Sequence, residues 1–167
     1  GPTPAGTFND FSLPILITSD AGCTNKKSIV VMPEGLMFKS SKGIYLLSRA
    51  LELKYIGADV EAFNAFDVTS AQLIPTVYEV RFTLTNGVCL VFDYYMNQWS
   101  VYTNISAVDS TIFQNAYTYL KSDGTIYQET PGVYNDNGAF IQLSLTTSWI
   151  SFAGLQGYER FYDMLLL

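Results

Sequence analysis

One short motif occurs three times in the chain, and it constrains the fold more than any other feature. Each copy has an aromatic residue, two variable residues, a serine or threonine, a polar turn-forming residue and a glycine. The copies are Phe38–Gly43, Phe82–Gly87 and Tyr119–Gly124. The second glycine follows the first by 44 positions, and the third follows the second by 37. Propeller blades repeat at about 40 to 50 residues; the first spacing is within this range and the second is slightly below it, so the recurrence predicts one structural unit used three times.

Each copy of the motif predicts a β-hairpin. A polar residue followed by glycine between two apolar runs supplies the positive φ angles that tight hairpin turns require. We therefore assign Gly43, Gly87 and Gly124 to hairpin turns. Short runs of β-branched or aromatic residues follow the turns, as expected of central strands: Ile44–Leu47, Val88–Phe92 and Thr125–Tyr127.

Further strands are expected on both sides of each hairpin. They are Ser28–Met32 and Leu53–Ile56 for the first copy, Glu79–Phe82 and Trp99–Tyr102 for the second, and Thr111–Phe113 and Phe140–Leu145 for the third. The unit is then a four-stranded antiparallel meander, repeated at about residues 26–60, 74–104 and 108–146. We predict an all-β fold of β-propeller-type blades, which bury their sheet faces against one another. A β-sandwich or barrel is the alternative, because it uses equally short strands.

The composition agrees with a folded β protein. Apolar residues make up 49% of the chain, charged residues 14% and aromatic residues 15%, which suits one sizeable core and pleated surfaces. We expect residues 1–167 to form a single β domain. The chain has no initiator methionine and stops on the apolar run Met164–Leu167, so we expect an excerpt of a larger protein. Gly1-Pro2 fits either a protease-cleavage scar or a native loop.

The formal net charge of -6 argues against a nucleic-acid grip and against binding to anionic membranes. A local basic stripe of Lys26, Lys27, Lys39 and Lys42 could still face a partner, although ordinary solvated lysines are the simpler interpretation. No apolar run approaches the roughly 18 residues of a membrane-spanning helix. We predict no membrane partner.

The two cysteines have neither a metal-site spacing nor the number of a disulfide framework. We interpret Cys23 and Cys89 as reduced, buried thiols. The chain contains no histidine, which removes Ser-His-Asp and Cys-His nucleophilic sites, imidazole acid–base catalysis and histidine metal sites.

Paired carboxylates are the remaining catalytic option, since two of them can hydrolyse glycosides. The candidates are Asp59 with Glu61, Asp93, Asp109 and Glu129. They occur at strand ends or turns, where solvated surface charge is the simpler interpretation. Asn135–Gly138 is rich in oxygen ligands but lacks the residue order of a calcium loop, so we interpret it as a hairpin turn. We predict no catalytic, cofactor-binding or metal-binding residue.

The two tryptophans are expected to have structural roles. Trp99 follows a polar turn and starts a strand, so we predict that it packs across blades with its indole N–H on a nearby acceptor. Trp149 is assigned the same role. A tryptophan exposed for ligand stacking is the alternative in both cases.

Several segments together resemble the packaged-DNA stabilisation, or tail-hub, proteins of short-tailed bacteriophages. They are Asp20–Cys23, Ser28–Val30, Gly35–Leu47, Tyr55–Val60, Asn97–Val101, Thr147–Trp149 and Ala153–Leu155. The resemblance extends over nearly the whole chain, and its motifs are diffuse, with no active site to transfer. It implies a non-enzymatic virion protein, assembled in the bacterial host cytoplasm, that closes the portal after packaging and forms part of the DNA exit tube.

The resemblance also implies particular partners. They are the phage portal or adaptor, other tail proteins, and further copies of the parent protein in a homo-oligomeric ring, while DNA passes nearby without sequence-specific binding. An acidic wall would repel the DNA backbone and let it slide. Two other functions stay open: a propeller that recognises a cell-surface glycan, and a carboxylate glycosidase. A binding propeller should present aromatic and amide side chains on one loop rim, whereas a structural one should show apolar lateral patches.

Overall fold

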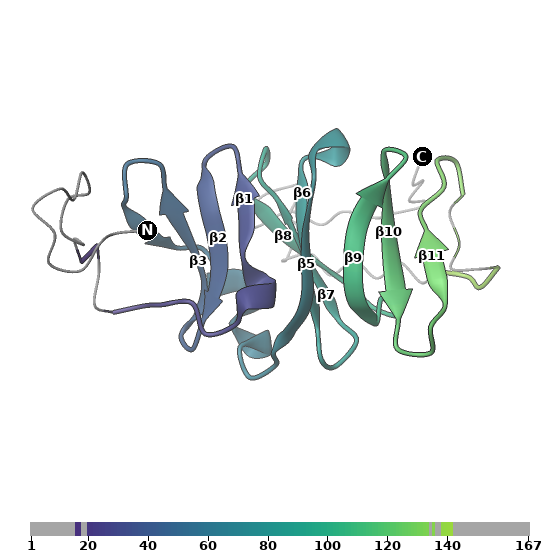
Figure 1. The fold of residues 1–167 in the computed structure, drawn as a ribbon, viewed down its shortest axis with the longest axis horizontal. Coiled ribbons are helices and arrows are strands. Elements are labelled where there is room, and N and C mark those ends of the chain that lie inside the picture. Colours follow the sequence, from purple (N-terminus) through teal and green to yellow (C-terminus); the bar gives the residue numbers. More distant parts are fainter. Residues whose placement is uncertain (1–15, 18–19, 134, 136–137, 142–167) are drawn as a thin grey trace, which may run out of the picture. The chain divides into compact units, whose positions relative to one another are not determined.

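The computed structural model describes residues 16–17, 20–133, 135 and 138–141. The prediction of an all-β fold is confirmed, because the described chain forms three antiparallel sheets joined by short connections (Figure 1). The chain divides into two compact units, residues 1–131 and 132–167. All three sheets belong to the first unit, so the predicted repeat at 108–146 crosses the boundary. Each sheet is open at both edges, and the described residues form no closed barrel.

Each sheet is a meander in which consecutive strands pair. The first sheet contains β1 (Val30–Met32), β2 (Gly35–Ser40), β3 (Gly43–Ser48) and β4 (Leu53–Tyr55). The second contains β5 (Val68–Ile74), β6 (Glu79–Leu84), β7 (Cys89–Asp93) and β8 (Gln98–Tyr102). The third contains β9 (Ala107–Phe113), β10 (Ala116–Lys121) and β11 (Ile126–Gln128). The described residues also form three short 3-10 helices: η1 (Lys26–Ser28) before β1, η2 (Ala58–Phe63) between β4 and β5, and η3 (Pro75–Val77) between β5 and β6.

Two predicted repeat boundaries differ from the structure. The second sheet begins at Val68 instead of near residue 74, because β5 is a full strand that the sequence prediction missed. The sequence prediction missed β5 because the centre of this strand is polar; Ser70 is buried there, and its hydroxyl contacts Ser110 Oγ at 2.6 Å. In the third repeat, Phe140 and Ile141 are not in a strand, and the rest of the predicted strand lies outside the described residues.

The three motif glycines all lie where the second strand of a sheet turns into the third. Gly87 and Gly124 have φ angles of 80° and 85° and complete matching loops. The N–H of Gly87 donates to the Leu84 carbonyl, and that of Gly124 to the Lys121 carbonyl, both at 3.0 Å. A type I turn followed by a left-handed glycine is a standard hairpin loop, which explains why Asn-Gly and Asp-Gly occur here.

Gly43 has a different geometry at the same topological position. It is the first residue of β3, pairs with Ser40 and has a φ of 123°. A Cβ atom on Gly43 would lie 2.7 Å from the Tyr55 ring. Glycine is therefore required at this turn by close packing as well as by the backbone conformation.

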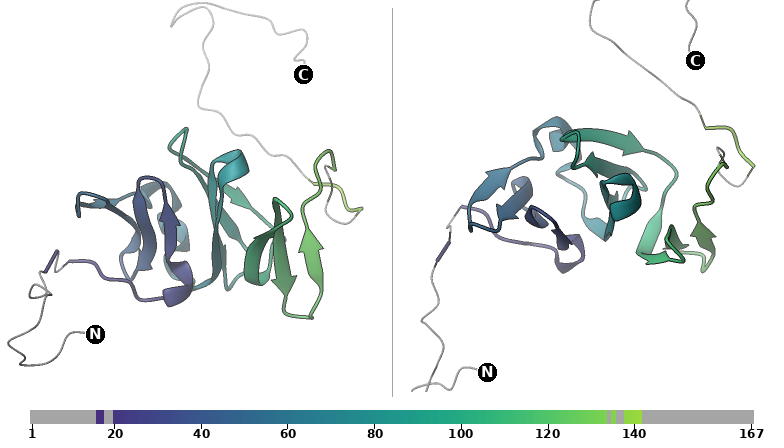
Figure 2. Two further views of the ribbon diagram at one scale, coloured as in Figure 1. Left: turned by 45° about the horizontal axis from the view of Figure 1, so that its top comes forward. Right: turned by 90° about the horizontal axis from the view of Figure 1, so that it is seen from above.

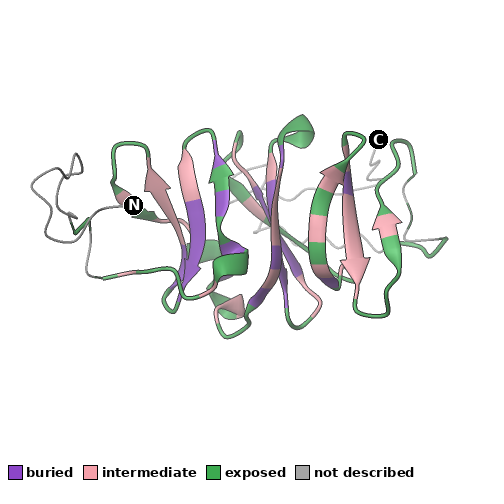
Figure 3. Ribbon diagram, viewed as in Figure 1, coloured by how far each residue is buried: buried purple, intermediate pink, exposed green. Residues whose placement is uncertain are grey.

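The main hydrophobic core lies between the first and second sheets, as the purple segments of Figure 3 show. It contains Val30, Met32, Met37, Ile44, Val60, Val68, Val80, Phe82, Leu84, Leu90 and Phe92. Trp99 packs at its edge and donates its indole N–H to the Ile56 carbonyl at 2.8 Å, so it joins the second sheet to the segment that follows the first. Only Ala107 and Tyr117 of the third sheet are among the buried apolar residues that the structure describes.

The sheets follow one another in chain order (Figures 1 and 2). Their first strands pack together, β1 against β5 and β5 against β9. The first strand of each sheet therefore lies next to the first strand of the neighbouring sheet.

Candidate functional site

The interface between the second and third sheets differs from the apolar core because it contains a buried arginine. Arg81 projects from β6 and is only 5% exposed. Its guanidinium pairs with the Glu79 carboxylate at 2.8 Å and also with Glu129, which follows β11. The guanidinium carbon lies 4.7 Å from the centre of the Tyr117 ring on β10 and 5.5 Å from that of Tyr102 on β8.

The positive charge of Arg81 is paired with two carboxylates within this interface. Burial alone would lower the pKa of Arg81, but Glu129 and then Glu79 outweigh that effect and raise it. A guanidinium bound by two carboxylates offers little to an anionic ligand, while its contacts join residues of β6, β10 and the end of β11. The arrangement clamps the third sheet onto the second.

The same interface holds the thiol of Cys89. Burial raises the pKa of Cys89 to about 11, and nearby Arg81 opposes this only in part. Burial likewise raises the pKa of the neighbouring Tyr117 hydroxyl. Because the thiolate is the reactive form of cysteine, Cys89 is inert at neutral pH.

The two cysteines should react very differently. The prediction that both are buried is wrong for Cys23, which is exposed, with its thiol 3.2 Å from the Asn25 carbonyl. We expect Ellman's reagent at about pH 8 to label one thiol rapidly and the second only after denaturation. Cys23→Ser should remove the rapid phase alone. Two rapid phases in the native protein would contradict the buried, protonated state of Cys89.

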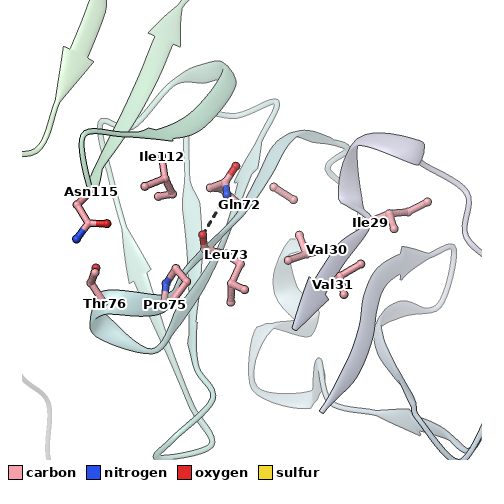
Figure 4. A pocket seen from close by; sticks show the side chains of 10 residues that line it. Ile29, Val30, Val31, Gln72, Leu73, Pro75, Thr76, Ile112 and Asn115 are labelled. Carbon is pink, nitrogen blue, oxygen red and sulfur yellow. Dashed lines mark hydrogen bonds between the residues drawn. The ribbon is translucent and has the colours of Figure 1, made fainter. Parts of the chain in front are cut away.

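A pocket of about 490 Å³ lies where the first strands of the three sheets meet (Figure 4). Its lining is Ile29, Val30 and Val31 near the first sheet, Ala71, Gln72, Leu73, Pro75 and Thr76 of β5 and η3, and Ile112 and Asn115 of the third sheet. No lining residue carries a charge. Its volume is within the range of small-ligand sites, which are mostly apolar with a few placed polar groups.

The predicted carboxylate candidates are not assembled into a catalytic pair. Asp59 and Glu61 lie on η2, where Glu61 accepts a hydrogen bond from the Tyr55 hydroxyl at 2.7 Å. Asp93 accepts from two amides of its own turn, Asp109 accepts from the Ser110 amide, and Glu129 pairs with Arg81. Glu61, Asp93, Asp109 and Glu129 therefore each stabilise a local structural feature.

The suggested basic stripe does not form. Lys39 is 5% exposed, and its ammonium group donates to the carbonyls of Asn64 and Phe66. Burial lowers the pKa of Lys39, with Asp67 acting in the opposite direction. Lys26, Lys27 and Lys42 are exposed. The four lysines therefore do not form one exposed stripe, because Lys39 faces the protein interior.

The remaining sequence predictions concern the C-terminal part. Trp149 lies outside the described residues, as do two residues of Asn135–Gly138. In that segment the Gly138 amide donates to Asn135 Oδ1 at 2.7 Å. Within the described ranges, no group of histidine, cysteine or acidic residues could hold a metal ion, and no helix is long and apolar enough to span a membrane.

Sequence reasoning missed Arg81, Tyr117 and the pocket. The sequence gives no signal for the burial of Arg81, because Arg81 occupies a polar position in the regular polar–apolar alternation of Glu79–Leu84, a pattern that predicts a solvent-facing side chain. No protein-family model matches the chain, and a comparison with curated proteins gives no match. Functional inference therefore depends on the geometry and on the motif resemblance.

Proposed function

We propose that the chain is a non-enzymatic structural component of a phage virion, a tail-hub or head-completion protein whose blade-like sheets stack laterally around the DNA exit tube. The observation that carries this proposal is the outer face of the first sheet, which points away from the second. Met37 and Ile44 belong to the core shared with the second sheet. Because side chains alternate along a strand, their neighbours Phe38 and Tyr45 project to the opposite face.

The outer face of the first sheet is mostly apolar or aromatic, with Ser40 at the end of β2, and Phe38 and Ser40 on it are buried. Register pairing aligns Val31 with Leu36, Leu47 and Leu53, and aligns Phe38 with Tyr45 and Tyr55. The Tyr45 ring centre lies 6.2 Å from that of Phe38 and 5.1 Å from that of Tyr55. Such a face suits packing against another sheet of the same kind, which is the lateral contact that a ring of blades requires.

The charge of the chain also supports the proposal. With a net charge of -6, the protein repels the DNA backbone on average, and such a surface suits passage of DNA better than capture. Four of the carboxylates named as catalytic candidates, Glu61, Asp93, Asp109 and Glu129, have structural hydrogen-bond or ion-pair partners, which supports a structural role for them.

Immunogold labelling of particles of the phage that carries the gene tests this function. We expect label at the portal vertex or along the tail, and no retardation of duplex DNA by the purified protein at physiological salt. Particles that lack the chain, although infected cells make it, would contradict the proposal.

Three lysine variants test the lateral contact. Val31 is 66% exposed on the outer face of the first sheet and also lines the end of the pocket, so it is tested together with Leu36, which aligns with it on that face outside the pocket lining. Val31→Lys and Leu36→Lys should each reduce the copies incorporated per particle severalfold. Val101→Lys is the control, because Val101 is a 43% exposed strand valine of the second sheet. Incorporation of Val31→Lys and Leu36→Lys at the wild-type level would show that the outer face is not a contact.

A further inference from the structure

Five turns lie at one end of the three sheets, the upper end in Figure 1. A meander reverses direction at every turn, so the β1–β2, β3–β4, β5–β6, β7–β8 and β9–β10 turns lie at this end, which we call the turn rim. The glycine hairpins occupy the opposite end. The two ends can therefore be compared directly.

At the turn rim, five residues other than glycine have left-handed φ angles. At the opposite end, glycines have these angles. The five rim residues are Leu51, Tyr78, Asn97, Gln114 and Asn115, with φ angles of 63°, 60°, 55°, 50° and 66°. Asn104 is the sixth such residue in the described ranges and lies in the β8–β9 connection. Glycine would avoid the steric cost of this conformation. Leucine, tyrosine and amide residues occupy these positions despite the steric cost of the left-handed conformation, which indicates that their side chains have a function.

Exposed aromatic rings project from the turn rim. Tyr78 is 52% exposed and Tyr95 is 76% exposed. The ring centre of Tyr78 lies 5.6 Å from that of Tyr95 and 5.8 Å from that of Tyr94. The carboxylate of Asp93 holds the turn, because its Oδ1 accepts from the amides of Tyr95 and Met96 at 2.9 and 2.8 Å. The rings are positioned by a fixed turn and still face solvent.

The uncharged pocket extends to η3 in the β5–β6 turn of the turn rim. Thr76 lines the pocket and lies two positions before Tyr78 in the same loop. Figure 4 shows Thr76 and Asn115 at one end of the pocket and Val30 and Val31 at the other. The polar groups of the lining are the hydroxyl of Thr76 and the amides of Gln72 and Asn115, each able both to donate and to accept hydrogen bonds.

We propose that the pocket and the adjoining turn rim bind a neutral oligosaccharide. Sugar hydroxyls both donate and accept, as the amides and the threonine of the pocket do. The apolar C–H faces of pyranose rings stack on exposed aromatic rings such as Tyr78 and Tyr95. The lack of charge in the lining and the acidic net charge of the chain disfavour anionic glycans. The proposal is independent of a tail location.

An array of neutral and charged bacterial surface glycans, probed with the full chain, tests this site, followed by calorimetric titration of the neutral glycans that bind. Asn115→Gly removes the amide but keeps the left-handed turn, and Tyr95→Ala removes an exposed ring. We expect each variant to raise Kd about tenfold and the glycan to be recovered uncleaved. Ile126→Ala is the control, because Ile126 is 68% exposed on β11, and its Kd should equal that of the wild type.

Three outcomes would overturn the proposal. They are an array on which no neutral glycan binds, an array on which only charged glycans bind, and titrations in which Asn115→Gly and Tyr95→Ala bind as tightly as the wild type. Loss of these variants from particles without any glycan binding would assign the turn rim to a protein contact instead. A chain found in the tail that binds no neutral glycan would overturn this inference and leave the proposed function intact.

Discussion

Replacing Arg81 with methionine is expected to lower the free energy of unfolding by about 3 to 5 kcal/mol, the usual cost of removing one partner of a buried ion pair. The Glu79 side chain is only 16% exposed, so it would keep a charge in a poorly solvated place without its partner. Glu129 is 47% exposed and can turn to water, which places the expected loss toward the lower end. Chemical denaturation followed by tryptophan fluorescence measures it.

Two further variants separate the ion pair from general effects of arginine removal. Arg49→Met is the matched control, since Arg49 is exposed and its Nε donates only to the Pro33 carbonyl at 2.7 Å; it should cost less than about 1 kcal/mol. Adding Glu79→Gln and Glu129→Gln to Arg81→Met should recover part of the loss, because no unpaired charge then remains. A loss for Arg81→Met no larger than that for Arg49→Met would refute the clamp.

The loss should also be local to the third sheet. That sheet contributes few buried apolar residues, so the Arg81 cluster holds it to the second sheet together with the Thr69 hydroxyl, which donates to the Ala107 carbonyl, and the Ser70–Ser110 contact. Regions with few buried contacts open first in native-state hydrogen exchange. Arg81→Met should therefore speed exchange in β9–β11 and raise the labelling rate of Cys89 more than it affects the first sheet.

Local sequence chemistry was enough to predict the hairpins but not the interfaces between sheets. Asn-Gly and Asp-Gly are tied to one backbone conformation, so Gly87 and Gly124 could be placed from neighbours alone. β5 was missed because its Ser70 is buried by a hydroxyl from a different sheet. The partner of Ser70 is Ser110, which is 40 positions away in the chain, and no local sequence pattern predicts this contact.

The pocket is a stronger example of the same limit. Its lining comes from three sheets, and none of its residue types is unusual where it stands in the sequence. From the sequence, the turn rim could be expected only as a set of polar turns. Nothing in the sequence shows that Leu51 and Tyr78 have left-handed φ angles. Propensity disfavours such residues there, so sequence reasoning gives them no special role.

Phe82→Ala is expected to cost about 3 to 5 kcal/mol, as for large aromatic residues removed from packed cores. Phe82 is fully buried on β6 between Ala71 and Leu90 of the neighbouring strands, and its ring centre lies 6.3 Å from that of Trp99. Both flanking strands are held by backbone pairing, so the core cannot collapse into the space. Urea denaturation measures the loss.

The control for this variant is Phe113→Ala, because Phe113 is 56% exposed on β9 and should cost less than about 1 kcal/mol. Equal losses at Phe82 and Phe113 would contradict a core centred between the first and second sheets. Arg81 and Phe82 are adjacent on β6 but point to opposite faces, so their variants report on different interfaces. Phe82→Ala should expose Cys89 only through global unfolding, whereas Arg81→Met should expose it at denaturant concentrations where the first sheet is still folded.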